Sequence, residues 1–346
     1  MKKIISLILM LGIVLSIPMG AMAADGTVLD FDFDFPSGMS VYTLDWAREH
    51  DDELYEEMKQ ENILMDAYDN YSDLSIWVSY MPYYNMDSKE MSDTDFEAFA
   101  YYMIKMLNEV PGCKAVAQGF YSHPQAEFAI IREGINSAYG TFFVWQYITL
   151  FEGLAVTVAA TYNSHKGQME PEHQQMLEDF IDSIDFHDTW RPKKRVEQIY
   201  NDPYTDIVLR LPENWEVKEY IEPRQLFESY GGMAGLTYGY ADVYAELNFF
   251  DRLFWKRSEF DNSYLNSELV AQITGINAQD ITTAEYGGRE YYIAEGMYKD
   301  EETGEDLWLT KAIHVDNGYL HVFEFNDSSD SPYFKDLESM LENAMY

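Results

Sequence analysis

The sequence predicts an α+β protein of two related domains in tandem, each an antiparallel β-sheet flanked by helices. Three observations indicate the repeat. Each half closes with an amphipathic helix, each closing helix follows a strand that leaves a glycine turn, and each half opens with a proline motif after an alternating strand. The late strands are expected at 153–159 and 318–325, and the openings are Phe35-Pro36-Ser37-Gly38-Met39 and Leu211-Pro212-Glu213-Asn214-Trp215.

The two closing helices have the same apolar face. Residues 171–184 begin with Pro171 and residues 332–344 with Pro332, and proline suits the first turn of a helix. Positions i, i+3, i+4 and i+7 hold Leu177, Phe180, Ile181 and Ile184 in the first helix and Leu337, Met340, Leu341 and Ala344 in the second. This spacing makes one apolar stripe, so each helix is expected to lie on an apolar surface.

Between opening and close, each half is expected to contain half-buried antiparallel strands. Apolar residues alternate with polar or small ones over 74–80 and again over 243–249. Further strands are expected within 115–149 and 281–314. Alternation with period two is typical of strands that bury one face.

A central helix is expected in both halves. The first is capped by Ser92 and ends at Pro111-Gly112, and its buried face consists of Phe96, Phe99, Ala100, Met103 and Leu107. The second begins at Asn262 or Ser263 and ends at Gly275, with a face formed by Leu265, Leu269 and Ile273. Each half therefore has a sheet with one inserted and one closing helix.

The amino terminus has the features of a signal peptide. Lys2 and Lys3 precede an apolar run over 4–19, and Ala21-Met22-Ala23 supplies small residues before a cleavage site. The sequence predicts that residues 1–23 are removed after Ala23 and that the mature chain is secreted or extracytoplasmic; a retained anchor is the alternative. Beyond residue 24 no apolar stretch is long enough to cross a bilayer, so no stable membrane span is expected after cleavage.

The remaining residues, 24–346, are enough for two domains. We assign 24–190 to the first domain, 191–203 to a basic linker and 204–346 to the second domain. The linker contains the cluster Arg191-Pro192-Lys193-Lys194-Arg195. An exposed connector is the favoured interpretation, and a docking site or protease-sensitive hinge is the alternative.

The chain is strongly acidic. Its 23 basic and 61 acidic residues give a net charge of −38, and removal of Lys2 and Lys3 leaves 21 − 61 = −40. Such a charge excludes nucleic acid as a partner, because phosphate binding needs clustered Lys and Arg. The charge favours solubility, and a cation or cationic partner is the alternative.

This order of elements resembles the PsbP-like domains. The resemblance covers nearly all of both halves as a pattern without an invariant motif, and it is carried by residues 36–39, 153–159, 180–186 around Ser183, 212–215, 318–325 and 337–344. It implies tandem domains, each with an antiparallel sheet between helices. It also implies an accessory, noncatalytic role, because photosystem members of that family are extrinsic subunits and many bacterial relatives are exported. It identifies no cofactor, metal or site residue.

No motif of a catalytic or metal site is present in the sequence. Asp30, Asp32 and Asp34 have the spacing of a calcium loop, but Phe35 and Val41 stand where an EF-hand needs glycine and glutamate, so an amphipathic strand is predicted. The acidic loops 300–306 and 327–330 are expected to be solvated tips, with weak calcium binding as the alternative.

The lone Cys113 excludes an intramolecular disulfide and is predicted to begin a strand rather than to act as a nucleophile. The seven histidines have no zinc-ligand spacing. His314 and His321 lie on predicted strands and could converge, but one is expected to face solvent and one the core.

Tyrosine clusters such as Tyr80, Tyr83 and Tyr84 or Tyr238, Tyr240 and Tyr244 are read as strand residues, with a binding surface as the alternative. The sequence therefore predicts an exported, noncatalytic accessory or binding protein for an unidentified extracellular ligand or envelope component. A carboxylate-based hydrolase without a recognisable motif and a weak calcium-binding envelope protein remain as alternatives.

Overall fold

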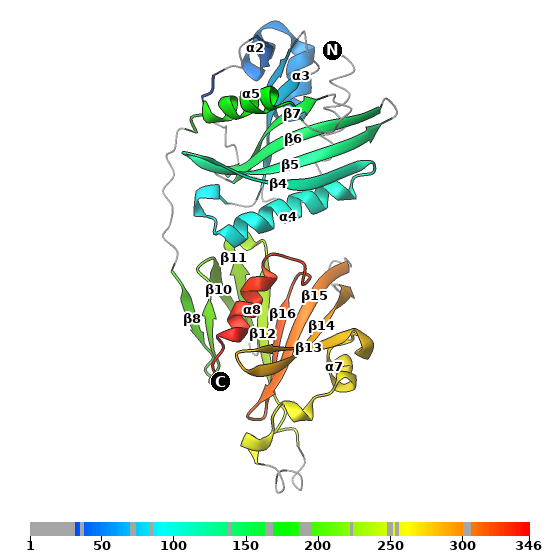
Figure 1. Ribbon diagram of the computed structural model, residues 1–346. Coiled ribbons are helices and arrows are strands. Elements are labelled where there is room, and N and C mark those ends of the chain that lie inside the picture. The colour runs from blue at the N-terminus through cyan, green and yellow to red at the C-terminus, as the bar shows by residue number, and fades with distance from the viewer. Residues whose placement is uncertain are drawn as a thin grey trace. The chain divides into compact units, whose positions relative to one another are not determined.

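The structure is a computed structural model that describes residues 32–34, 38–69, 74–83, 86–137, 140–151, 153–162, 169–186, 196–221, 224–247, 252, 256–299 and 306–346. The chain divides into two compact units. The first comprises Met1–Met91 and Phe99–Lys193, and the second comprises Ser92–Ala98 and Lys194–Tyr346. Each unit contains a seven-stranded antiparallel sheet with helices (Figure 1), which confirms the predicted α+β class.

The first sheet has the strand order β1-β2-β3-β7-β6-β5-β4. Its strands are β1 (Ser40–Thr43), β2 (Ile63–Tyr68), β3 (Ser75–Pro82), β4 (Cys113–His123), β5 (Ala126–Ser137), β6 (Gly140–Phe151) and β7 (Leu154–Tyr162). The strands β1 to β3 and β4 to β7 form two antiparallel meanders, and β3 pairs with β7 to join them.

The second sheet repeats this topology strand for strand, with the order β10-β11-β12-β16-β15-β14-β13. Its strands are β10 (Trp215–Ile221), β11 (Arg224–Ser229), β12 (Gly235–Asp242), β13 (Ile281–Tyr286), β14 (Arg289–Lys299), β15 (Asp306–Asp316) and β16 (Tyr319–Phe325). A separate ribbon pairs β8 (Gln198–Asn201) with β9 (Val208–Leu211), and β8 lies within the segment that the sequence assigned to a linker. The shared strand order supports the internal repeat.

The central and closing helices occupy matching places in the two halves of the chain. In the first half of the chain they are α2 (Leu44–His50), α3 (Asp52–Gln60), α4 (Asp93–Glu109) and α5 (Pro171–Asp182), with the 3₁₀ turn η1 (Ser88–Glu90). In the second half they are α7 (Ser267–Thr274) and α8 (Phe334–Glu342), with the 3₁₀ turns η2 (Tyr230–Gly232), η3 (Arg257–Glu259), η4 (Asn262–Tyr264) and η5 (Ala278–Asp280). The helices α4 and α7 both precede the fourth strand of a sheet, and α5 and α8 both follow the seventh.

The closing helices confirm the predicted apolar faces. Leu177, Phe180, Ile181 and Ile184 are buried around α5, as are Leu337, Met340, Leu341 and Ala344 around α8. After each helix the chain forms an isolated antiparallel bridge to an early segment of the same unit, Asp32 to Asp185 in the first and Val208 to Met345 in the second. The strands before the helices also leave glycine turns as predicted, with φ of 79° at Gly153 and 77° at Gly318.

The first sheet is covered on both faces. The side chains of Ile76, Val78, Val156 and Val158 join the core formed with α5, and α4 lies on the opposite side of the sheet (Figure 1). The expectation that the strand at 74–80 is half-buried is therefore wrong, because Trp77 and the neighbouring serines are buried on the second face.

Three further expectations for the second half are wrong. Residues 243–246 form a turn rather than a strand, since β12 ends at Asp242. The central helix α7 begins only at Ser267, because the side chain of Asn266 caps it by accepting a hydrogen bond from the Leu269 amide. Val270 rather than Ile273 is its buried residue. The predicted end at Gly275 is confirmed by a left-handed φ of 74°.

The first central helix agrees with its prediction. Ser92 and Asp95 cap α4 reciprocally, since the Ser92 amide donates to Asp95 Oδ2 at 2.9 Å and the Asp95 amide donates to Ser92 Oγ at 3.1 Å. The predicted apolar positions Phe96, Phe99, Ala100, Met103 and Leu107 are all buried.

Several predicted features lie outside the described residues. They include the signal peptide 1–23 with its cleavage site after Ala23, Asp30, residues 35–37 of the first opening, Tyr84, the basic cluster 191–195 and most of the acidic loop 300–306. Across the part of the chain that is described, none of the helices has the length and apolarity needed to cross a membrane.

Candidate ligand-binding pocket

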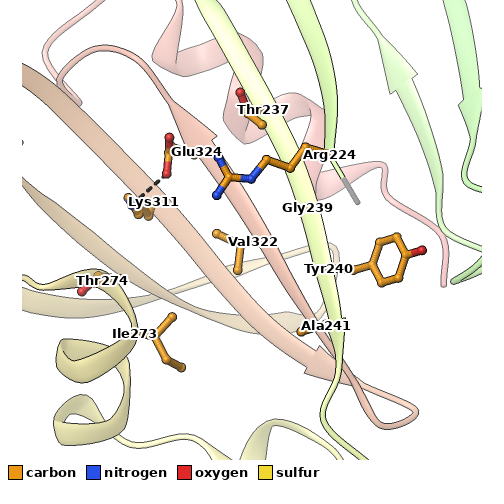
Figure 2. A pocket seen from close by; sticks show the side chains of 10 residues that line it. All are labelled: Arg224, Thr237, Gly239, Tyr240, Ala241, Ile273, Thr274, Lys311, Val322 and Glu324. Atoms are coloured by element: carbon orange, nitrogen blue, oxygen red, sulfur yellow. Dashed lines mark ion pairs between the residues drawn. The ribbon is translucent and has the colours of Figure 1, made fainter. Parts of the chain in front are cut away.

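A cavity of about 260 Å³ lies on one face of the second sheet (Figure 2). Its polar lining consists of Arg224, Thr237, Thr274, Lys311 and Glu324. The remaining lining residues are Gly239, Tyr240, Ala241, Ile273 and Val322. These residues come from β11, β12, β15, β16 and the end of α7, so the pocket exists only when the sheet is assembled.

Strand register brings the central residues of the pocket together. Thr237 of β12 pairs with Glu324 of β16, and Glu324 pairs with Lys311 of β15, so the three side chains form one row across three strands. The next row places Gly239 between Arg224 and Val322. Directly paired residues project from the same face of a sheet, so both rows face the pocket.

Gly239 makes room for the longest side chain of the pocket. Figure 2 shows Arg224 extending from β11 over β12 toward Val322 and Glu324. Gly239 lies directly opposite Arg224 on β12 and has no side chain that would block this path. The guanidinium group can therefore reach the centre of the sheet from its neighbouring strand.

The first sheet closes the corresponding position with bulky and apolar groups. Counted from the turn glycines Gly153 and Gly318, Ala159 of β7 corresponds to Glu324 of β16. The partners of Ala159 are Gln146 and Trp77, where the partners of Glu324 are Lys311 and Thr237. Trp77, Gln146 and Ala159 are all buried, whereas Thr237, Lys311 and Glu324 are only half-buried.

The inserted helix accounts for much of this difference. In the first half α4 has 17 residues, whereas α7 has 8 and is stopped by the left-handed Gly275. Val270 packs into the core beside β13 to β16, but Ile273 is 41% exposed and lines the pocket. Because α7 ends early, part of the sheet face that it covers remains open.

The pocket has an unequal distribution of charge. Lys311 Nζ lies 2.7 Å from Glu324 Oε2, and the two side chains are only 16% and 30% exposed. Arg224 forms no ion pair with any residue that the structure describes. The paired Lys311 and Glu324 cancel in charge, so Arg224 leaves the pocket with one positive charge.

No His, Cys, Ser or Asp is among the residues that line the pocket. Thr274 Oγ1 donates to the Val270 carbonyl at 2.8 Å and accepts from the Ile276 amide at 3.2 Å, so this hydroxyl is engaged in closing the helix. The carboxylate of the pocket, Glu324, forms an ion pair with Lys311.

Buried carboxyl groups with strongly raised pKa values lie in the other unit. Burial raises the pKa of Glu133 to about 7 and that of Asp66 to about 6. Glu133 accepts hydrogen bonds from Gln146 and, at 3.5 Å, from the Cys113 thiol, and Asp66 accepts one from Ser75. Neither residue lines the pocket.

Cys113 begins β4, as the sequence predicts. Its side chain is half-buried, and burial together with the charge of Glu133 raises the pKa of the thiol to about 12. A thiol with so high a pKa is a poor nucleophile near neutral pH.

The histidines of β15 and β16 converge, contrary to the expectation that one faces solvent. His314 and His321 are paired across the two strands and are both buried, on the face opposite the pocket. Tyr238, Tyr291 and Tyr346 surround them. The other described histidines do not join this group; His123 packs against aromatic rings of the first core, and His165 and His187 lie outside the described residues.

The predicted tyrosine clusters do not share one groove. Tyr83 packs its ring edge-on to Phe99, Tyr238 is buried beside His321, and Tyr244 stacks under the Arg257 guanidinium. Of the clustered tyrosines that the structure describes, Tyr240 alone contacts the pocket. Tyr80, Tyr238 and Tyr240 are strand residues as predicted, whereas Tyr83 follows β3 and Tyr244 lies in the turn after β12.

No metal site is formed by the described residues, since no three His, Cys, Asp or Glu side chains are grouped so that they could hold an ion. The described part of the predicted strand is an isolated bridge between Asp32 and Asp185, and the Asp34 amide donates to Ser183 Oγ at 3.0 Å. Calcium binding by the loops stays a prediction.

Comparison with known proteins gives structural similarity without a family assignment. No protein-family model and no curated protein matches the chain. A crystal structure from Bacteroides thetaiotaomicron VPI-5482 matches at 10% identity and a TM-score of 0.32, covering 42% of this chain and 47% of that one. The solution structure of cyanobacterial PsbP (CyanoP) from Synechocystis sp. PCC 6803 matches at 11% identity and a TM-score of 0.30, covering 49% of this chain and 98% of that one. The structural neighbours of this chain thus include a PsbP protein, while its membership of the PsbP-like family stays a prediction.

Proposed function

We propose that the chain is an exported, noncatalytic binding protein whose second unit holds a small ligand in the pocket beside α7. One observation carries this proposal: the two sheets share their topology, yet the second leaves open the position that the first fills with Trp77, Gln146 and Ala159. Small-molecule sites are concave, with apolar walls and a few polar groups that orient the ligand. Val322 and Ile273 together with Arg224 and Thr237 supply such a lining.

The composition of the pocket supports binding rather than catalysis. General acid-base catalysis needs a group that can exchange a proton close to the reacting atoms. The hydroxyl groups of the pocket belong to Thr237, Tyr240 and Thr274, and that of Thr274 is engaged with the backbone at the end of α7. A role in holding a molecule requires only the cavity and its charge.

Export is part of the same proposal. It is supported by the charged, apolar and small-residue regions over 1–23. Mass spectrometry of the protein recovered from the culture medium or cell envelope should give an amino terminus at Ala24. A chain that keeps Met1 and fractionates with membranes would favour the retained anchor instead.

Each unit is proposed to be a PsbP-like domain with an accessory role. The arrangement of an antiparallel sheet between a central and a closing helix supports this assignment in both units. The second unit would then have gained a binding site through the shortening of its central helix. The first unit would be a domain of the same fold in which side chains fill the corresponding site.

The binding function is tested by NMR spectroscopy on the intact mature chain with a library of small fragments. Amide signals of Thr237, Gly239, Val322 and Glu324 should shift for at least one fragment. In Thr237→Trp, which places the tryptophan of the first sheet at the corresponding position of the second, these shifts should be lost.

Thr282→Trp provides the matched control, because Thr282 is an exposed β13 residue that does not line the pocket. This variant should bind the fragments as the parent protein does. The proposal is contradicted if fragments shift only amides away from the pocket, or if Thr237→Trp leaves the pocket shifts unchanged.

A further inference from the structure

We propose that the ligand of this pocket is a small monocarboxylate with a short apolar tail, held by Arg224 at its carboxylate and by Val322, Ala241 and Ile273 along its tail. The inference rests on the proposed binding function and adds the chemical class of the ligand. It follows from the charge, the shape and the volume of the pocket.

The charge balance calls for one negative charge on the ligand. Lys311 and Glu324 pair at 2.7 Å and are largely withdrawn from solvent, so they neutralise each other. Arg224 is exposed and has no ion-pair partner within the described part of the chain. A planar guanidinium matches the geometry of a carboxylate through two parallel hydrogen bonds. A single carboxylate therefore completes the pocket.

The apolar residues lie beside this charge rather than around it. Val322 shares a strand row with Arg224, and Ala241 follows Gly239 on the same face of β12. Ile273 approaches from the end of α7 with 41% of its surface exposed (Figure 2). An aliphatic tail that lies along β12 and β16 would cover these three side chains, which favours its binding by burial of apolar surface.

The cavity limits the length of the tail. Its volume of about 260 Å³ holds roughly eight to nine groups the size of a water molecule, at about 30 Å³ each. An acid of roughly four to eight non-hydrogen atoms fits this volume. The matching site in the first unit is filled by Trp77, so no such molecule is expected there.

The test compares probes of one size that differ in charge. Hexanoate, hexylammonium, hexanol and inorganic phosphate are titrated into the intact mature chain, with affinity measured by calorimetry and location by NMR of the pocket amides. Hexanoate should bind at least tenfold more tightly than hexanol and hexylammonium. Phosphate, which lacks an apolar part, should bind more weakly than hexanoate.

Variants then assign the selectivity to Arg224. Arg224→Gln should reduce the preference for hexanoate over hexanol to less than twofold, and a dispersed amide spectrum shows that the variant is folded. Arg210→Gln is the matched control, because it removes one exposed cation of β9 that does not line the pocket. It should keep the full preference.

The outcomes separate the two proposals. If hexylammonium or phosphate binds best at the pocket, the monocarboxylate class is wrong and the binding function stands. If Arg224→Gln keeps the preference for hexanoate, the assignment of the carboxylate to Arg224 is wrong. If no probe and no library fragment shifts the pocket amides at millimolar concentration, the binding function itself is overturned.

Discussion

His314 and His321 face each other across β15 and β16 with both rings buried, at 6% and 1% exposure. The ring of Tyr346 packs edge-on against both, with centroids 5.3 Å and 4.8 Å away. His314 Nδ1 lies 2.8 Å from the Glu290 carbonyl, and His321 Nδ1 lies 3.0 Å from the Tyr238 hydroxyl. These contacts suit two neutral imidazoles, and they place a titratable pair in the core of the second unit.

Acid should destabilise the second unit through this pair. Burial lowers the pKa of His321 to about 3, and the nearby His314 lowers it further. Burial also lowers the pKa of His314. The charge of Arg289 adds to this lowering, whereas the charges of Asp316 and Asp261 oppose it. The unfolded chain takes up protons below its ordinary histidine pKa of 6.5, whereas the folded chain does not. The contribution of this pair to the free energy of unfolding is therefore largest above pH 6.5 and is lost as the pH drops toward 3.

The measurement is urea unfolding of the intact chain at pH 7.5 and pH 5, followed by hydrogen exchange of the β15 and β16 amides. His321→Gln removes one of the titrating groups, so its loss of stability between these pH values should be smaller than that of the parent. His50→Gln changes an exposed histidine and should behave as the parent. An equal acid sensitivity in His321→Gln would contradict the assignment.

Glu133 should give the first unit the opposite dependence on pH. Burial raises its pKa from 4.5 to about 7, so the folded state keeps a proton that the unfolded chain releases above pH 4.5. The free energy of unfolding therefore declines as the pH rises from 4.5 to 7, by about 3 kcal/mol at most for a shift of this size. Glu133→Gln should stabilise the first unit at pH 8 by roughly 1–3 kcal/mol and leave it nearly unchanged at pH 4.5.

Hydrogen exchange of the β5 and β6 amides at both pH values reports this effect. Glu49→Gln, which alters an exposed carboxyl group of the same unit, should change neither value. A Glu133→Gln protein that is less stable than the parent at pH 8 would show that the carboxylate is favourable where it lies.

Local features of this fold could be predicted from the sequence, whereas the pocket could not. The closing helices and the turns at Gly153 and Gly318 depend on neighbouring residues, and their patterns indicated them correctly. The pocket depends on strand register, which sets Thr237, Glu324 and Lys311 in one row although they lie far apart in the chain. Nothing in the local sequence of these residues signals that pairing.

The wrong expectations have related causes. The apolar alternation over 243–249 predicts a strand, but β12 ends at Asp242, which accepts a hydrogen bond from the Ala245 amide and pairs with Arg257. The predicted start of α7 is too early, because residues 262–264 form the separate 3₁₀ turn η4 with its own cap at Asp261, and Asn266 caps the helix. An alignment of the two halves sets Lys311 against Gln146 and Glu324 against Ala159. Such an alignment indicates a charged row in the second sheet that the first sheet lacks.

Cys113 should react slowly with alkylating reagents in the folded protein. Burial and Glu133 raise the pKa of its thiol to about 12, so at pH 8 the thiolate is about 10³-fold less abundant than for an ordinary cysteine. The rate of modification by iodoacetamide, measured by mass spectrometry, should rise by at least two orders of magnitude on denaturation in urea. Glu133→Gln should raise the rate in the folded protein, because it removes the negative charge that disfavours the thiolate. Rapid alkylation of the folded parent protein would contradict this account.

Each closing helix should stabilise its own sheet. Leu177 of α5 and Leu337 of α8 occupy corresponding positions and are both fully buried. Truncation of a buried leucine to alanine removes apolar contacts and leaves a cavity, which costs about 2–5 kcal/mol. Leu177→Ala should therefore accelerate hydrogen exchange in β3 and β7, and Leu337→Ala in β12 and β16, each with little effect on the other sheet. The exposed Val196→Ala change serves as the control and should alter neither. If Leu337→Ala loosened β7 as much as β16, the two units would not unfold as separate cooperative bodies, and the repeat would describe their topology but not their energetics.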